Sequence, residues 1–169
     1  MKNIIFIGGI HGSGKGTICE KISEQRDFVH LTASQILKWG EVSSQAEKKV
    51  QDIDNMQSRL LYGLNKIVEP DKTYLLDGHF CLFNSAGVVT KIPTETFTNI
   101  NPRLILVVVD DCAEIKNRLE KRDNKYYDLK VLENMQEVEL SYSNEIASNL
   151  GVQHYIIENG NIDIILNLF

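Results

Sequence analysis

The segment Gly9-Ile10-His11-Gly12-Ser13-Gly14-Lys15-Gly16-Thr17 is the most informative part of this sequence. It follows a short apolar run, Ile4 to Ile7, and precedes a segment with helical spacing of apolar residues. Its glycines allow positive backbone dihedrals, so that successive amides can turn inward around an anion. The helix that begins near Lys15 directs its free N–H groups at the same anion. The pattern Gly-x-x-x-x-Gly-Lys between a strand and a helix therefore predicts a phosphate-binding loop rather than a plain glycine-rich turn.

Short apolar runs alternate with helical patterns along the rest of the chain. The runs that predict buried strands are Asn3–Gly9, Phe28–Leu31, Thr73–Asp77, Leu104–Val109 and Val152–Ile157. The predicted helices are Gly16–Arg26, one that carries Ile36 and Leu37 behind a Thr32 or Ser34 cap, Ser44–Glu69, Cys112–Arg122, Asp128–Asn149 and a short one from Ile162. This alternation predicts an α/β chain with the P-loop nucleoside triphosphate hydrolase fold, a five-stranded parallel sheet with helices on both faces. Ligands are expected at the carboxyl ends of the strands. The segment Asn84 to Asn101 fits no element and is left open as a partner surface, a lid element or a hairpin.

Composition narrows the class of protein. With 43% hydrophobic and 24% charged residues, we expect one globular domain over residues 1–169. The net charge of −5 argues against non-specific nucleic-acid binding, which needs a basic surface. Three cysteines without a Cys-x-x-Cys pair favour a reducing compartment. No apolar run approaches the roughly 20 residues of a membrane helix, and the N-terminus lacks a signal-peptide pattern, so we expect a cytoplasmic protein without a membrane partner. The oligomeric state is open, with a monomer favoured.

The end of the loop carries a resemblance to a known family. The residue after Lys15 is Gly16, where the general pattern has Ser or Thr, and the hydroxyl follows at Thr17. This Gly-x-Gly-Lys-Gly-Thr ending resembles the nucleoside monophosphate kinases of the adenylate kinase type. The resemblance implies ATP as phosphoryl donor and Mg²⁺ held largely through water, with Thr17 near the metal. The loop residues expected to bind the ATP phosphates are Gly9, Gly12, Ser13, Gly14, Lys15, Gly16 and Thr17.

The third predicted strand ends in Asp77-Gly78-His79-Phe80, which resembles the Asp-Gly strand end of the same kinases. In that family the aspartate orients the hydration shell of Mg²⁺, so Asp77 is expected to act on the metal with Thr17. The alternative is an ordinary Asp-Gly turn. The family continues with a base-side arginine, which this chain lacks. His79 is either an acceptor contact or a histidine packed at the strand end.

The acceptor side of the resemblance lies at residues 30–38. In the family, the hydroxyl and the arginine of this segment reach the nucleoside monophosphate, and Thr32 and Lys38 stand at the matching positions. Lysine keeps the charge of arginine and loses its two-pronged grip on phosphate. The resemblance therefore implies an acceptor-binding helical insertion over about residues 32–69. A hydroxyl cap and a solvated lysine are the alternative.

Arg118 and Arg122 stand four residues apart, on one face of a predicted helix. In the resembled kinases two arginines at this spacing enter a lid and clamp the transferring phosphoryl group, whose negative charge planar donors stabilise. The alternative is a solvated, charged helix end. The lid would be short, about residues 120–128. No arginine follows Arg122, and Glu139-Leu140-Ser141-Tyr142 stands where the family has one.

The resemblance implies a compact kinase, closest in layout to the short archaeal-type adenylate kinases. It would transfer the γ-phosphoryl group of Mg-ATP to a small phosphorylated acceptor, a nucleoside monophosphate above all. Lys15, Arg118, Arg122 and Asp77 would carry the catalysis. Two alternatives stay open: a nucleotide-binding regulator or slow ATPase that uses the loop as a switch, and a kinase for a non-nucleotide metabolite.

Overall fold

The protein is described from a computed structural model over residues 3–37, 53–84 and 86–169, with side chains left out for 53–57. The main sheet consists of β1 (Ile4–Gly8), β2 (Phe28–Thr32), β3 (Thr73–Asp77), β6 (Leu104–Val109) and β7 (Gln153–Glu158). These strands are all parallel and lie in the order β2-β3-β1-β6-β7. The helices are α1 (Lys15–Gln25), α3 (Ile53–Ile67), α4 (Thr94–Ile100), α5 (Cys112–Asp123), α6 (Leu129–Leu150) and α7 (Asp163–Leu166), and residues 33–37 are also helical. The predicted fold class is confirmed.

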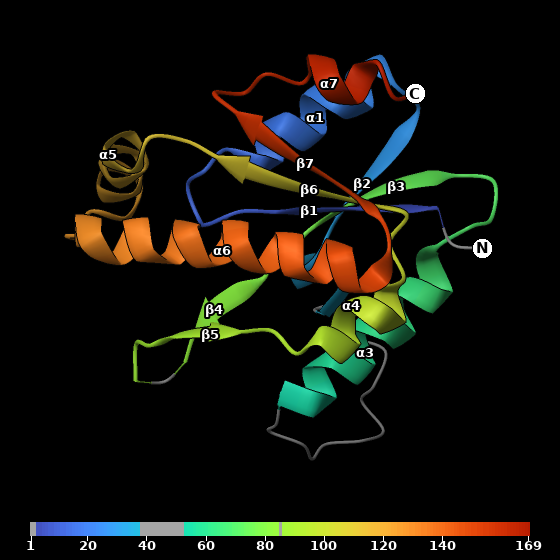
Figure 1. Cartoon of the computed structure of the whole chain (residues 1–169), viewed down its shortest axis with the longest axis horizontal. Coiled ribbons are helices and arrows are strands. Elements are labelled where there is room, and N and C mark those ends of the chain that lie inside the picture. The colour runs from blue at the N-terminus through green and yellow to red at the C-terminus, as the bar shows by residue number, and fades with distance from the viewer. Residues whose placement is uncertain (1–2, 38–52, 85) are drawn as a thin grey trace.

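Both faces of the sheet are covered, as Figure 1 shows with α1 and α7 above it and α3, α4 and α6 below it. The side chains of β1 alternate between the two cores. Ile4 and Phe6 pack in the core under α3, α4 and α6, while Ile5 and Ile7 pack in the core with α1 and α7. A strand buried on both faces needs apolar residues at every position, which explains its unbroken apolar run.

A third apolar cluster fixes the phosphate loop to the helices beyond the sheet. Ile10 of the loop packs with Ile115 and Leu119 of α5 and with Leu132 and Met135 of α6. In Figure 1, α5 lies at the left end of the sheet, beyond β6. This cluster holds α5 beside the loop.

The two helices that follow β6 begin at aspartate caps. The Asp111 carboxylate accepts hydrogen bonds from the backbone at the start of α5. The Asp128 carboxylate accepts from Lys130 N at 2.8 Å and Val131 N at 3.2 Å at the start of α6. Helix α6 ends at Gly151, whose φ of 67° is the left-handed conformation of a helix C-cap. The predicted bounds of α6 are therefore one residue off at each end.

Two further segments need comparison with the sequence, one predicted as a helix and one left open between a partner surface, a lid element and a hairpin. The predicted helix Ser44–Glu69 corresponds to α3, Ile53–Ile67, and its first part lies outside the described residues. The segment Asn84–Asn101 contributes to an antiparallel hairpin, β4 (Cys81–Phe83) with β5 (Val89–Lys91), followed by α4. Strands this short give no readable periodicity, which is why the sequence leaves them unassigned.

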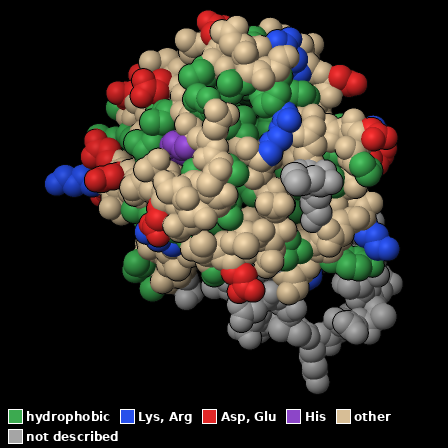
Figure 2. All heavy atoms as spheres, turned by 45° about the vertical axis from the view of Figure 1, so that its right-hand side comes forward, with side chains coloured by type: hydrophobic (Ala, Val, Ile, Leu, Met, Phe, Trp, Pro, Cys, Tyr) green, Lys and Arg blue, Asp and Glu red, His purple; other side chains and the backbone are tan. Residues whose placement is uncertain are grey.

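Hydrophobic side chains are exposed at several places on the face in Figure 2. Hydrophobic side chains gather at the top of this view, over α7, where Ile164, Leu168 and Phe169 are exposed. Within the described residues, every helix is too short or too polar to cross a membrane.

The end of β1 leaves no room for a side chain at Gly8. A Cβ built there lies 2.2 Å from Phe80 Cε2, inside the ring's van der Waals surface. Gly8→Ala is therefore expected to lower the free energy of unfolding by about 1–3 kcal/mol, because the buried Phe80 must shift. Urea denaturation measures it. Gly16→Ala is the matched control, since no atom lies within 4 Å of its built Cβ. Equal stability of Gly8→Ala and wild type would contradict this packing.

Candidate functional site

A cavity of about 1180 Å³ lies at the carboxyl ends of the main strands. Each of the five strands contributes to its lining at or just after its last residue. These contributions are the loop after β1, Thr32 of β2, Asp77 of β3, Asp110 after β6 and Asn159 after β7. The cavity continues along Leu37, Leu60, the β4–β5 hairpin and α4. One cavity therefore joins the phosphate loop to an apolar chamber under the hairpin.

The phosphate loop has the backbone geometry that its glycines predict. Gly9 and Gly12 have φ values of 142° and 80°, and a Cβ at Gly9 would lie 2.6 Å from Val108 O. Gly12 to Thr17 line the cavity. Gly16 has open space around a built Cβ, so its departure from the usual Ser or Thr is not imposed by crowding.

Lys15 is buried, and its ammonium is held by the loop itself. Nζ donates hydrogen bonds to Gly9 O at 2.7 Å and to Ile10 O at 3.1 Å. Burial lowers the pKa of Lys15, and the negative charges of Asp77 and Glu139 oppose that shift. The ammonium therefore stays on the loop at the cavity wall. Beside it, the buried Ser13 hydroxyl has no hydrogen-bond partner among the described residues, and this leaves it available to an anion.

Asp77 ends β3 and reaches the cavity close to the phosphate loop. Its carboxylate lies 3.7 Å from His30 Nε2, and Cys19 completes a group whose ligand atoms lie within 4.8 Å of one another. Burial, followed by the charge of Asp77, raises the pKa of Cys19, so the sulfur is a thiol. Thr17 lines the same cavity. Oxygen donors from Asp77 and Thr17 fit a hydrated Mg²⁺, which prefers oxygen ligands and retains water.

Two of the three acceptor residues predicted from the sequence, Thr32 and His79, line the cavity. Thr32 lines the cavity and also forms a capping box, because its Oγ1 accepts from Gln35 N at 3.1 Å while its N donates to Gln35 Oε1 at 3.3 Å. Lys38 lies outside the described residues. His79 lines the cavity, and its ring centroid is 4.2 Å from that of His11. Desolvation within the loop, reinforced by neighbouring His79, lowers the pKa of His11 to about 4, so that His11 is neutral near pH 7.

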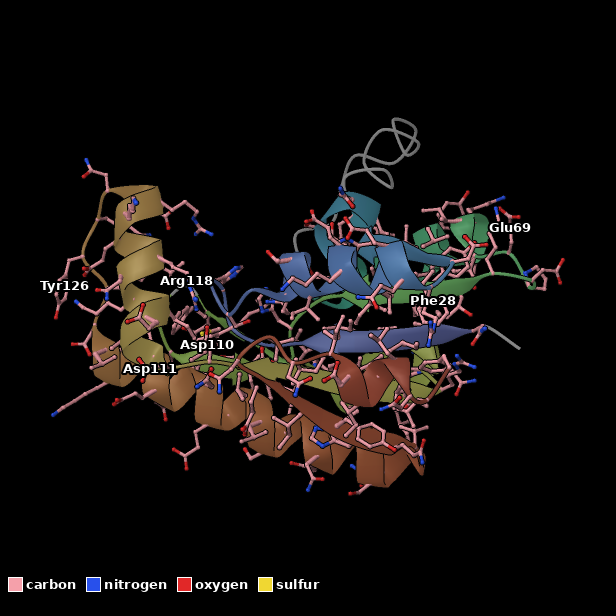
Figure 3. All side chains as sticks on the ribbon, turned by 90° about the horizontal axis from the view of Figure 1, so that it is seen from above. Phe28, Glu69, Asp110, Asp111, Arg118 and Tyr126 are labelled. Carbon is pink, nitrogen blue, oxygen red and sulfur yellow. The ribbon has the colours of Figure 1, made fainter. Side chains whose placement is uncertain are left out.

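Both arginines of the predicted clamp line the cavity, and each is already paired with a carboxylate. Arg118 Nη2 lies 2.7 Å from Asp110 Oδ2, and Arg122 contacts both oxygens of Asp123 at 2.6 and 2.8 Å. Figure 3 shows Arg118 and Asp110 on the side of α5 nearest the sheet, with Tyr126 on the other side. The pairs place the guanidinium groups at the cavity, but in contact with protein anions.

Glu139 is the site residue that sequence reasoning missed. It is fully buried, and its carboxylate accepts hydrogen bonds from the backbone N–H of Gly9, Phe80 and Cys81. The signal was available in the helical spacing, since Glu139 interrupts the buried stripe formed by Leu132, Met135, Tyr142 and Ile146. A charged residue on an apolar stripe indicates a specific buried partner.

A family model described as an AAA domain, AAA_17, matches residues 8–136. The chain belongs to this AAA domain family. The matched range includes the phosphate loop, Asp77 and both arginines. Two curated kinases are similar to this chain in sequence. One is adenylate kinase isoenzyme 1 of Cyprinus carpio, 36% identical over an alignment of 87 residues, which covers 45% of this chain and 44% of the relative.

The alignment with the second relative covers most of this chain. This relative is UMP-CMP kinase 3 of Oryza sativa subsp. japonica, 29% identical over 92% of this chain and 74% of the relative. These relatives confirm the resemblance to nucleoside monophosphate kinases. The chain spans less than half the length of the first curated relatives it matches. A solved shikimate kinase of Acinetobacter baumannii shares the fold, with a TM-score of 0.59, 14% identity and coverage of 99% of this chain and 92% of the other.

Proposed function

We propose that this protein is a nucleoside monophosphate kinase, which transfers the γ-phosphoryl group of Mg-ATP to the phosphate of a nucleoside monophosphate. The observation that carries the proposal is the continuous cavity of about 1180 Å³ that joins the phosphate loop, Asp77 and Arg118 to an apolar chamber. The kinase relatives support it. We place the activity in the cytoplasm, on small-molecule nucleotides, with a monomer as the acting form.

In this proposal the donor lies on the phosphate loop. Loop amides and the Lys15 ammonium bind the β- and γ-phosphates, and Asp77 with Thr17 would hold hydrated Mg²⁺ beside them. The metal would supply charge neutralisation between the phosphates. Arg118 and Arg122 stabilise the charge of the moving phosphoryl group after exchanging their carboxylate partners for it. Positioning and electrostatics are sufficient for this chemistry, so no covalent intermediate is invoked.

The acceptor occupies the other end of the cavity. Apolar side chains of Leu37, Leu60 and Phe97 form walls suited to a planar base, and Thr32 offers a hydroxyl near the loop. We assign acceptor binding to the insertion at about residues 32–69, with Lys38 and His79 as further contacts. The short lid at about residues 120–128 includes the end of α5, which carries Arg122.

One observation favours a second candidate, a nucleotide-binding regulator or slow ATPase. Both Arg118 and Arg122 are engaged by aspartates, and no arginine follows Arg122 in the sequence. A protein that only binds and slowly hydrolyses ATP does not need them at the phosphoryl group. A kinase for a non-nucleotide metabolite would share the whole donor site.

An ADP-release assay with Mg-ATP, run alone and with each common nucleoside monophosphate, tests the proposal. Turnover that depends on one acceptor and exceeds the ATP-only rate is the expected result, and it names the acceptor. A low rate that is indifferent to every nucleotide acceptor would contradict the proposal and support the regulator or the metabolite kinase.

Removal of one clamp arginine is expected to have a moderate effect. Arg118→Ala should lower kcat about 10-fold with the KM for ATP nearly unchanged, because Arg122 remains to share the transition-state charge. Steady-state kinetics on the purified variant measures this. Arg26→Ala is the control, because Arg26 is not among the residues that line the cavity. An unchanged kcat for Arg118→Ala would remove Arg118 from the mechanism.

A further inference from the structure

Glu139 is a buried charge that the proposed phosphoryl transfer does not use. Its side chain has 0% exposure, and it comes from α6, on the opposite face of the sheet from α1. Burial of a carboxylate is costly unless its oxygens are hydrogen-bonded. The hydrogen bonds of Glu139 must therefore offset the free energy lost when its carboxylate is removed from water.

Those contacts join the ends of two neighbouring strands. The pairing of β1 with β3 ends at Ile7 and Asp77, and beyond this pair the two strands are no longer joined by the sheet register. There Glu139 Oε2 accepts from Gly9 N at 3.2 Å and Oε1 accepts from Cys81 N at 3.2 Å, while Phe80 N donates to both oxygens, at 2.9 Å to Oε1 and 3.1 Å to Oε2. The carboxylate thus bridges the start of the phosphate loop and the segment that follows Asp77.

The same peptide unit of the loop also holds the lysine. Gly9 N–H donates to Glu139, and Gly9 C=O accepts from Lys15 Nζ at 2.7 Å. The order of contacts is Glu139, then the Gly9 residue, then the Lys15 ammonium. The absence of a side chain at Gly8 leaves room for the carboxylate, because a Cβ there would lie 3.3 Å from Glu139 Oε2.

We propose that Glu139 is a positioning residue of the donor site, which fixes Gly9 and thereby sets the place of Lys15 and its relation to the Asp77 segment. The inference rests on the proposed function, in that the loop binds Mg-ATP. Glu139 touches no substrate. It acts through the orientation of the Gly9 residue.

Glu139→Gln tests this with almost no change in size. The amide has one accepting oxygen and an NH₂ group that cannot accept, so it cannot serve both Gly9 and the Phe80–Cys81 pair. The Kd for Mg-ATP, measured by calorimetry, is expected to rise about 10-fold, which is the loss expected for a hydrogen bond to a charged group. The KM for the acceptor should change less than the Kd for Mg-ATP, since Glu139 reaches the acceptor end only through His79 Nδ1, 3.7 Å from its Oε1. Glu137→Gln, exposed on the same helix, is the matched control and should bind as wild type.

A double-mutant cycle with Lys15→Ala separates positioning from general destabilisation. If Glu139 acts through Gly9 and Lys15, Glu139→Gln should weaken ATP binding much less in the Lys15→Ala background than in wild type. Additive losses, or a Glu139→Gln variant with the wild-type Kd, would overturn the inference. A wild-type protein that fails to bind Mg-ATP would instead contradict the proposed function.

Hydrogen exchange on the wild-type protein gives a test that does not depend on the variant folding. The Gly9, Phe80 and Cys81 amides should exchange slowly, since each donates to a buried carboxylate. Gly12, for which no such bond exists in the described contacts, serves as the internal reference. A Gly9 amide that exchanges as fast as Gly12 would overturn the inference.

Discussion

Lys15→Ala is expected to lower phosphoryl transfer about 10³-fold, the upper range for loss of one preorganised charged donor. The ammonium is buried at the cavity wall and donates hydrogen bonds to Gly9 O and Ile10 O. A cation from solvent therefore does not replace its charge in the variant. The loss should fall on the Kd for Mg-ATP as well as on kcat, because the ammonium faces phosphate charge both in the bound donor and in the transition state. Initial rates of ADP release with saturating acceptor measure it.

The variant must be compared with a folded reference. Lys130→Ala removes an exposed lysine at the start of α6 and should retain the wild-type rate. Circular dichroism and thermal unfolding show whether Lys15→Ala is folded, which we expect, because the side chain contacts loop carbonyls rather than the main apolar clusters. A folded Lys15→Ala protein with an unchanged rate would sink the assignment of this loop to catalysis.

Asp77→Asn should lower turnover about 10²-fold and raise the Mg²⁺ concentration needed for half-maximal rate. The carboxylate ends β3 at the cavity, and the amide keeps its shape while removing the charge that orients the hydrated metal. A titration of Mg²⁺ at fixed ATP measures both effects. Asp71→Asn, an exposed neighbour before the same strand, is the control. A normal Mg²⁺ profile in Asp77→Asn would place the metal elsewhere.

The features predicted well from the sequence are those with a local cause. The phosphate loop, the apolar strands and the aspartate that starts α6 depend on residues close in the chain, and all are present. The fold class followed from them. The sequence left the hairpin as one of three alternatives for residues 84–101, because β4 and β5 each have three residues and Phe83 and Val88 are exposed.

The site was harder to predict because its contacts join distant segments. Glu139 meets Gly9 across 130 positions of the chain, and only the folded sheet brings them together. The spacing of Arg118 and Arg122 predicted a shared direction, but not that each would pair with an aspartate. Capping by Thr32 could be anticipated from Gln35 three residues later, because that interaction is local.

The turn of the β4–β5 hairpin lies away from the contacts that tie the hairpin to α6, which Cys81 makes with Glu139 and Lys91 with Glu145. The hairpin forms its own two-stranded sheet, and its turn is closed locally by Asn84 Oδ1, which accepts from Ala86 N and Val88 N. Changes of length or composition at this turn leave the register of the five parallel strands untouched. Under the proposed function, this turn is therefore a place where the acceptor end of the cavity can be re-engineered without changing the strands that carry the phosphate loop.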